Sequence, residues 1–406
     1  MAYKKRGARL WLAHPTGTRS GRARLGCAVA SALTAALVVA GCASATTDTA
    51  ATSANAGSAP ALSQAAALQA FDAYVAASAK AAATNDGKLA LSVVTAAQQS
   101  LVSATLKSHR ASVSSGDTSA YSSTLSITAA LGLYRYGAPT FYLPEPAGYP
   151  RFFLADVTRG LVLKSSRPGD TDATTSVGGA QVPVNGRVLM VFEQSAAAGP
   201  WQLASVSSLP SGNTLPRLAT DKDGYIPQVP LKSADLLAQP YATGPLQAAM
   251  VDDGPASAAA KAVAAGPLTT GLYQAARDRY QGAGDAALSG LEVPAGDVYQ
   301  WSMEGTPYPA FALRLADGGA LVLYAMYLNS TVAVAGYFDD ASPIQPGPPI
   351  EVPLALLQSL PSGQPAPRVK LSGQELLSFA AIDPPASPAK ITVLAIGGGL
   401  NYASAS

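Results

Sequence analysis

Two glutamates occupy matching places in the two halves of the chain, and aromatic residues surround each of them. Glu145 precedes Tyr149 by four residues, and Glu304 precedes Tyr308 by four residues. A carboxylate in an aromatic-lined pocket suits a sugar or a cationic ligand. We therefore treat these four residues as a candidate ligand pocket in each half. The same residues also suit the alternative that the aromatic side chains fill two hydrophobic cores while the glutamates cap backbone groups or face solvent.

The residues that catalysis would require are scarce. A glycosidase needs two carboxyl groups roughly 5–10 Å apart in one site, and one glutamate per half does not supply that pair. After residue 41 the only histidine is His109, so neither a histidine-based zinc cluster nor a serine–histidine–aspartate triad is expected. We therefore predict no catalytic residues, no metal ligands and no cofactor, and we expect that the protein is not an enzyme.

Two short motifs resemble parts of known sites but lack the rest of them. Residues 387–390 read Ser-x-x-Lys, but two prolines place them in a loop. Residues 221–224 read Asp-Lys-Asp-Gly, which matches part of a calcium loop, although a third acidic position and the closing glutamate are missing. We predict a loop and a turn at these positions.

The two glutamates belong to a longer internal repeat. Residues 142–154 match residues 301–313, and residues 208–217 match residues 359–368 with seven identities in ten positions. The matches keep their order along the chain, which favours an internal duplication. A period of this length is far too long for a solenoid, so we predict two related domains in tandem, 60–240 and 241–406.

Each predicted domain combines helices with antiparallel strands. Helical composition covers 62–83, 89–109 and 256–280, and a capping-box pattern predicts a late helix after Ser372. Asn185-Gly186 predicts a hairpin over 182–192, and further strand signals lie at 201–209, 308–328 and 391–396. We expect an α+β fold with helices packed on a curved antiparallel sheet, for which nuclear-transport-factor-like and cystatin-like units are the nearest analogues.

The first 42 residues have the order of a secretory signal: basic, apolar, then small. The apolar run, 25–40, has 16 residues, which is short of the roughly 20 that a spanning helix needs. It ends in Val-Ala-Gly-Cys42, whose spacing resembles the lipobox of bacterial lipoproteins. The resemblance implies a signal peptide at 1–41, lipidation of the Cys42 thiol and attachment to the membrane. Residues 42–59 are rich in Ala, Ser and Thr, and we expect a flexible tether there.

Removal of the signal peptide changes the charge balance. Residues 1–41 hold seven of the 27 basic residues and none of the 25 acidic ones, so the remaining chain has a net charge of −5. No basic stripe remains that would bind nucleic acid.

The lipobox, the polar tether and two α+β units together resemble a family of actinobacterial lipoproteins of unknown function. The resemblance implies a location and an architecture but no reaction. We predict a membrane-anchored protein on the outer face of the cell membrane, with a binding or scaffolding role and an envelope protein or glycan as partner. Two alternatives remain, a solute-binding lipoprotein of a transporter and a carboxylate-based hydrolase of envelope polymers.

Overall fold

The computed structural model describes residues 62–114, 134–146, 148–161, 174–177, 180–183, 185–280, 298–333, 369–385 and 388–405. They all belong to one unit of the chain, which runs from Ala56 to Ser406. The predicted signal peptide, Cys42 and the predicted tether lie outside the described residues.

Three helices open the described chain, and local signals set their ends. The Ser63 side chain accepts a hydrogen bond from the Ala66 N–H at the start of the first helix, and Asn85 ends that helix in the left-handed conformation. Asp86 caps the second helix by accepting from two backbone N–H groups. The helices are α1 (Gln64–Thr84), α2 (Gly87–Ser92) and α3 (Ala96–Ser114).

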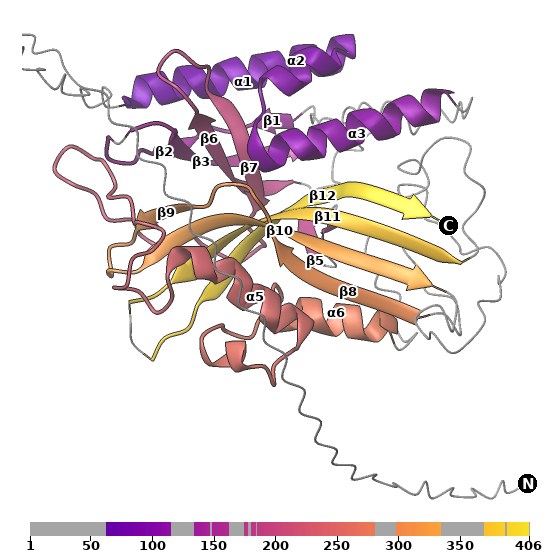
Figure 1. Ribbon diagram of the computed structural model, residues 1–406. Coiled ribbons are helices and arrows are strands. Elements are labelled where there is room, and N and C mark those ends of the chain that lie inside the picture. Colours follow the sequence, from indigo (N-terminus) through magenta and orange to yellow (C-terminus); the bar gives the residue numbers. More distant parts are fainter. Residues whose placement is uncertain are drawn as a thin grey trace, which may run out of the picture. The chain divides into compact units, whose positions relative to one another are not determined.

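Two sets of strands follow, separated by shorter helices (Figure 1). The first set is β1 (Tyr134–Tyr136), β2 (Thr140–Tyr142), β3 (Arg151–Leu161), β4 (Thr174–Val177), β5 (Ala180–Pro183), β6 (Gly186–Gln194) and β7 (Gln202–Ser208). Next come η1 (Pro240–Ala242), α5 (Thr243–Asp252), η2 (Ala258–Lys261) and α6 (Thr270–Tyr280). The second set is β8 (Val298–Gly305), β9 (Phe311–Arg314), β10 (Ala320–Ala333), β11 (Lys370–Asp383) and β12 (Thr392–Ala405).

Strands from both halves of the chain join one ten-stranded antiparallel sheet. Its order is β1-β3-β6-β7-β12-β11-β10-β8, with β2 also paired to β3 and β9 also paired to β10. The halves meet where Ser208 of β7 pairs with Ile396 of β12. The fold is therefore mixed helix and strand with a large antiparallel sheet, as expected, but the prediction of two tandem domains with a nuclear-transport-factor-like or cystatin-like shape is not confirmed.

Both faces of the sheet are packed near its centre. α1, α2 and α3 cover one face of the N-terminal strands, around Phe153 and Phe192. α5, η2 and α6 cover one face of the C-terminal strands, around Tyr299 and Phe379. The remaining faces of the two halves share a third core, in which the rings of Phe152 and Phe311 lie 4.6 Å apart. The sheet therefore bends so that its two halves pack on each other, with α1 and α2 outside one half, α5 and α6 outside the other, and α3 in contact with both.

The two halves repeat one order of elements. With η1 counted as part of α5, each half has three helical segments, two short strands that pair with one long strand, and then two further strands of the large sheet; the separate β4–β5 pair occurs only in the N-terminal half. A parallel bridge also recurs in each half, between a residue before the third helical segment and the beginning of the last strand. Val94 pairs with Leu203 at the start of β7, and Val263 pairs with Ile391 just before β12. The sequence matches do not follow this order strand by strand, because Phe152 lies on β3 whereas its partner in the repeat, Phe311, lies on β9.

Three local predictions are wrong. The helix predicted after Ser372 is β11, which pairs along its length with β10 and β12. The hairpin predicted around Asn185 does not form, because β5 pairs with β4 while β3 and β7 occupy both edges of β6. The strand predicted at 391–396 does not end there, because β12 continues through the glycines at 397–399, where a Cβ on Gly397 would lie 2.1 Å from the Val206 carbonyl oxygen. Glycine there allows β12 to approach β7 closely.

Candidate functional site

The first predicted pair, Glu145 and Tyr149, lies in the segment between β2 and β3. Glu145 is exposed, and its backbone N–H donates to the Ile226 carbonyl oxygen at 2.9 Å. Its own carbonyl oxygen accepts from the Gln228 side chain at 3.0 Å. Tyr149 is half-buried, and the Arg151 guanidinium lies 5.1 Å from its ring centroid. These contacts attach the segment to the chain that connects the two halves, and no described pocket joins the two residues.

The second predicted pair lies close together on the C-terminal half. Glu304 of β8 stands directly across from Tyr327 of β10 in the strand ladder. The Tyr327 hydroxyl lies 3.5 Å from that of Tyr308, and the Tyr308 hydroxyl lies 2.5 Å from the Ser100 Oγ of α3. The structure thus connects Glu304 to Tyr308 through Tyr327, and it adds Ser100 from the opposite half of the chain.

A small pocket adjoins Tyr308 where the start of α3 meets β10. Ala96, Ala97 and Ser205 line one side of it, and Phe311 and Ala325 line the other. Its volume is about 10 Å³, which is room for roughly one water molecule. A ligand larger than water would therefore bind outside this pocket, on the neighbouring surface.

That surface is one face of the C-terminal strands beyond the shared core. Side chains alternate between the two faces of a strand, and in β10 Met326, Leu328 and Val332 point into the core beneath α5 and α6. Tyr327, Asn329 and Thr331, at the alternate positions, point to the opposite face. We call this the polar face, and it consists of Gln300, Ser302, Glu304, Tyr327, Asn329, Thr331, Lys370, Ser372, Gln374, Asn401 and Tyr402.

Side-chain hydrogen bonds tie the polar face together across three strands. The Gln374 Nε2 donates to Asn329 Oδ1 at 2.9 Å, and the Asn401 Nδ2 donates to Gln374 Oε1 at 2.9 Å. Two residues farther along β10, the Thr331 hydroxyl lies 3.0 Å from the Ser372 hydroxyl of β11. A bulge between Gln374 and Glu375 shifts the register with β12 at this point. The chain of amides holds its side chains in defined positions, which favours recognition over a disordered polar surface.

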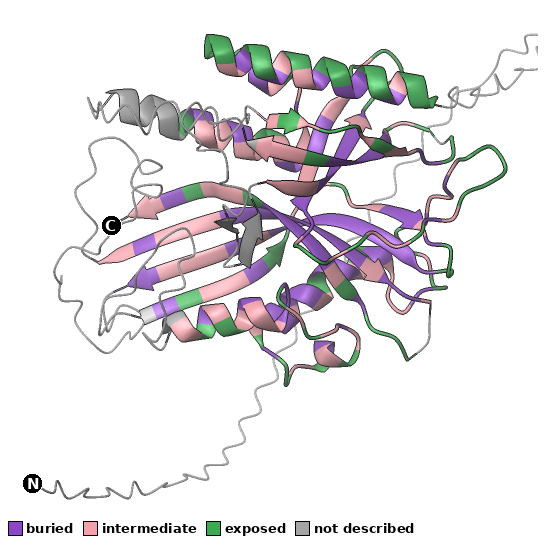
Figure 2. Cartoon of the chain, turned by 180° about the vertical axis from the view of Figure 1, so that it is seen from behind, coloured by how far each residue is buried: buried purple, intermediate pink, exposed green. Residues whose placement is uncertain are grey.

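The polar face is more open than the centre of the sheet. Figure 2 shows the C-terminal strands changing from buried residues at the meeting of the two halves to intermediate ones toward their far ends. Tyr402 of β12, on the polar face, is 59% exposed. Leu321 and Leu323 lie on the same face of the sheet but inside the shared core, and they are buried. α3 runs beside β12 along this edge (Figure 1). The start of α3 packs against Tyr308 and Tyr327 at one end of this surface, and β4 also contacts β12.

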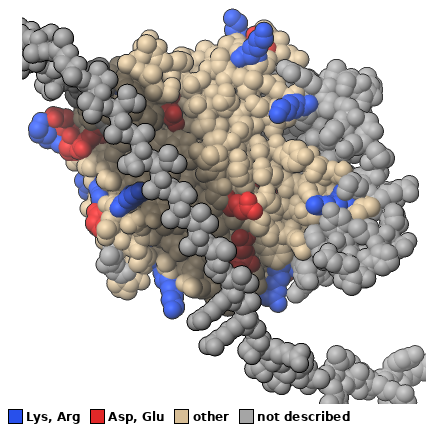
Figure 3. Space-filling view, in the orientation of Figure 1, with Lys and Arg blue, Asp and Glu red and all other residues tan. Residues whose placement is uncertain are grey.

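The polar face carries little charge. By type it has one carboxylate, Glu304, and one ammonium group, Lys370, among hydroxyls, amides and phenols. Burial, together with the hydrogen bond to Tyr308, raises the pKa of Tyr327 to about 12, so its hydroxyl stays neutral at physiological pH. The face can therefore donate and accept many hydrogen bonds without favouring an ion of either sign. On the side of the molecule seen in Figure 3, Lys and Arg are likewise scattered and not gathered in a stripe.

One carboxylate near Glu304, that of Asp252, was not predicted from the sequence. Asp252, at the end of α5, accepts a hydrogen bond from the Met303 N–H of β8 at 2.8 Å. Burial, together with the nearby charges of Asp253 and Glu304, raises the pKa of Asp252 to about 6. No short motif marks this residue, because 51 positions separate it from the strand that it contacts.

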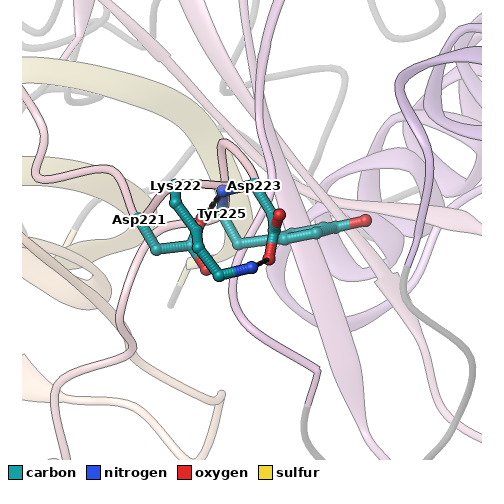
Figure 4. Close-up of polar contacts among 4 residues, drawn as sticks. All are labelled: Asp221, Lys222, Asp223 and Tyr225. Carbon is teal, nitrogen blue, oxygen red and sulfur yellow. Dashed lines mark hydrogen bonds and ion pairs between the residues drawn. The ribbon is translucent and has the colours of Figure 1, made fainter.

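The Asp221 motif is a turn, as predicted. Its Oδ1 accepts from the backbone N–H groups of Asp223 and Tyr225, both at 2.8 Å, and Lys222 contacts Asp223 (Figure 4). Gly224 takes a positive φ of 86°. The Asp221 carboxylate is therefore engaged by its own backbone. Within the described ranges, no three His, Cys, Asp or Glu side chains gather in a group that could hold a metal ion.

The remaining predicted site residue, Cys42, falls outside the described residues, so its lipidation stays a prediction. Among the helices that the structure describes, none has both the length and the apolar character needed to cross a membrane.

Comparison with known proteins connects most of the chain to one family. A family model described as "Domain of unknown function (DUF8094)" matches residues 58–398. An uncharacterized lipoprotein of Streptomyces coelicolor is 25% identical over 184 residues, covering 45% of each chain. An uncharacterized lipoprotein of Streptomyces avermitilis is 27% identical over 187 residues, covering 46% of this chain and 45% of its own. The chain thus matches about half the length of these relatives, and no solved structure matches it. The resemblance to actinobacterial lipoproteins of unknown function is confirmed.

Proposed function

We propose a function for this chain from the premise that it belongs to the family described as "Domain of unknown function (DUF8094)". The protein is a lipoprotein of the cell envelope, anchored by acyl chains on Cys42 and placed on the outer face of the cell membrane. The lipobox-like sequence at Cys42 and the names of the two Streptomyces relatives support this placement. The acyl chains supply the hold on the membrane, at about 0.8 kcal/mol for each buried CH₂ group.

The folded part acts as a non-catalytic binding module, and the polar face carries this proposal. It presents hydroxyl and amide side chains fixed by the Asn329–Gln374–Asn401 chain of hydrogen bonds. Sugar hydroxyls pair with such groups, and tyrosine rings pack against the apolar faces of sugar rings. Because the face has one charge of each sign, a neutral envelope glycan suits it better than an anionic polymer or a basic peptide.

Two measurements test the anchor and the binding. Metabolic labelling with a palmitate analogue should mark the wild-type chain, and Cys42→Ser should lose the label.

Calorimetric titration of the detergent-solubilised protein with neutral oligosaccharides released from the cell wall should show saturable binding. Gln374→Ala should weaken that binding at least about tenfold, equivalent to 1.4 kcal/mol. Gln274→Ala is the matched control, because it replaces a glutamine on the exposed surface of α6. It should bind the oligosaccharides as the wild type does. Label on the Cys42→Ser variant, or equal binding by both glutamine variants, would contradict the proposal.

One observation favours a second candidate, a hydrolase of envelope polymers. Asp252, with its pKa near 6, lies within electrostatic range of Glu304, and a glycosidase uses one protonated and one ionised carboxyl group. The candidate predicts slow release of reducing ends from wall polysaccharide that Asp252→Asn and Glu304→Gln each abolish.

The strand pairings bear on the other alternative, a solute-binding lipoprotein. The pairings between named strands of the described chain are all antiparallel. They do not match the parallel lobes that this alternative requires.

A further inference from the structure

A second group of polar side chains lies in the N-terminal half, on the face of β3 that packs against α1. Arg159 stands there at the end of the core that contains Phe153 and Val157. Tyr136 of β1 is its direct neighbour across the ladder, and Ser208 of β7 lies within reach on its other side. Tyr74 and Ser78 of α1 belong to the same group, and both are more than nine-tenths buried. Apart from the guanidinium, the polar groups of this cluster are hydroxyls.

The contacts of Arg159 leave its charge unbalanced. Its guanidinium carbon lies 4.4 Å from the ring centroid of Tyr134, and its Nη2 donates weakly to Ser208 Oγ at 3.4 Å. Its buried Nε has no hydrogen-bond partner, whereas the Ser78 hydroxyl interacts with that of Tyr74. The Arg159 Nε is therefore a buried donor without an acceptor, which costs about 1–3 kcal/mol.

Two other arginines of the described chain are balanced by acids. Arg187 pairs through two nitrogens with the carboxylate of Asp156, and Arg314 pairs with Asp235 at 2.8 Å. No carboxylate of the described residues forms an ion pair with Arg159. A partly buried charge is ordinarily paired, because removal from water is costly when no counter-charge compensates.

We propose that Arg159 and its hydroxyl neighbours form a binding site for an oxyanion of the phosphate type. A phosphate group offers unprotonated acceptor oxygens to the guanidinium and to the hydroxyl groups around it, and it supplies the negative charge that would balance Arg159. Tyr74 and Tyr136 remain neutral donors, because burial raises the pKa of both phenols. The site lies on the N-terminal half under α1, on different strands from the polar face, so it does not depend on the glycan proposal.

The test is a titration of the detergent-solubilised full-length chain with inorganic phosphate, at constant ionic strength adjusted with chloride. Phosphorus NMR line width reports binding, and thermal unfolding reports the stabilisation that follows from binding to the folded state alone. We expect a dissociation constant in the millimolar range. Arg159→Gln should weaken binding at least about tenfold, and Ser78→Ala, which suits a helix, should weaken it by about threefold while the protein stays folded.

Arg135→Gln is the matched control. Arg135 lies next to Tyr136 on β1, is exposed, and points to the other side of the strand. Its replacement removes the same charge and should leave phosphate binding unchanged. Equal phosphate binding by the wild type, Arg159→Gln and Ser78→Ala would overturn the proposal, as would the absence of any binding that exceeds the effect of chloride.

A second arm identifies the source of the phosphate group. Glycerol 3-phosphate and short-chain phosphatidylglycerol are compared in the same titration, with short-chain phosphatidylcholine, a zwitterion of zero net charge, as the counterpart. Tighter binding of phosphatidylglycerol that depends on Arg159 assigns the site to a lipid headgroup. Equal binding of glycerol 3-phosphate and phosphatidylglycerol, again dependent on Arg159, assigns it to phosphate groups free or carried on a polymer. Binding of phosphatidylcholine equal to that of phosphatidylglycerol would count against an anion site.

Discussion

The two halves of the sheet share an order of elements but differ in strand length. β3, β6 and β7 have 11, 9 and 7 residues, whereas β10, β11 and β12 have 14 each. The shared core engages the near parts of the long strands, around Leu321, Ala380 and Leu394. Their far parts continue beyond it and carry the polar face. The added length is therefore not needed to pair the halves, and it carries the surface on which we propose that binding occurs.

The halves also differ in where polar side chains gather. In the C-terminal half they lie on the open face, away from α5 and α6. In the N-terminal half the hydroxyl groups around Arg159 lie on the same face as the helices, beneath α1. An open neutral surface suits an extended glycan, whereas a narrow cluster around one charge suits a small anionic group. The same arrangement of elements thus places two polar groups of different chemistry in different surroundings.

The largest expected effect comes from the junction between the halves. Gly397→Ala would place its Cβ 2.1 Å from the Val206 carbonyl oxygen, so β12 would have to move away from β7. We expect a loss of at least about 3 kcal/mol in the free energy of unfolding, measured by urea denaturation. Gly399→Ala, two residues along, meets no atom within 4 Å and should change stability by less than about 1 kcal/mol. Equal effects of the two variants would mean that the close approach at Gly397 does not hold the halves together.

The next effect tests whether the halves share one core. Leu321 is fully buried against residues of both halves, so Leu321→Ala should cost about 2–5 kcal/mol. Both halves should then unfold in one transition at lower urea, seen at the same midpoint by tryptophan fluorescence and by circular dichroism. Leu231→Ala, at a position 37% exposed, is the control and should cost less than about 1 kcal/mol. Separate transitions in the Leu321→Ala variant would favour two independent domains over one bent sheet.

A smaller effect concerns Asp383, where β11 meets the segment that connects the halves. Its side chain is fully buried, Oδ1 accepts from the Ala238 N–H at 3.3 Å, and Oδ2 has no partner. Burial, with a contribution from Asp235, raises the pKa of this carboxyl to about 6, from 3.8 in an unperturbed chain. A raised pKa in the folded state means that stability is full below pH 4 and falls as the pH rises through 6.

Asp383→Asn removes that titration and keeps an oxygen acceptor for Ala238. The variant should be more stable than the wild type at pH 7.5, by an amount on the order of 1–3 kcal/mol, and about equally stable at pH 4. Thermal unfolding at both pH values measures the difference. Asp252 titrates in the same direction in both proteins, so only the difference between them bears on Asp383. A variant less stable at pH 7.5 would show that the ionised carboxylate is favourable where it lies.

The smallest expected effect on stability belongs to the polar face itself. Asn329→Ala removes one partly exposed hydrogen bond, to Gln374, and should cost about 1 kcal/mol or less. The same variant should nevertheless weaken oligosaccharide binding, because the Gln374 side-chain amide would lose the Asn329 oxygen that holds it in place. A loss of several kcal/mol in urea denaturation would instead make the amide chain a structural element of the sheet.

Much of this arrangement could be predicted from local patterns, and the failures have physical causes. Caps such as Ser63 and Asp86, and the Asp317-Gly318 turn between β9 and β10, act within a few residues, so the sequence reveals them. By contrast, Ser372 and Glu375 have a helix-start spacing, but pairing on both sides with β10 and β12 decides their conformation. Neither the bend of the sheet nor the meeting of Phe152 with Phe311 has a local signal.

The candidate sites divide in the same way. Glu304 and Tyr308 were identified from the repeat, and the structure connects them through Tyr327. The alternation of Met326, Leu328 and Val332 with polar residues could have extended the predicted strand beyond residue 328 and exposed Asn329 as a surface residue. Gln374 and Asn401 could not have been found, because a bulge sets their register. Arg159 lies on the opposite face of β3 from Asp156, the partner of Arg187, and no local spacing reveals that Arg159 has no acid across the strands.

Hydrogen–deuterium exchange of the full-length protein, with and without neutral oligosaccharides from the cell wall, tests the central claim most directly. The account predicts slower exchange on ligand addition in β8 and in the far parts of β10 and β11, residues 298–305, 326–333 and 370–376, with no change in β3 or β6. Protection confined to the N-terminal half, or no protection at saturating ligand, would contradict the assignment of the polar face as the binding surface.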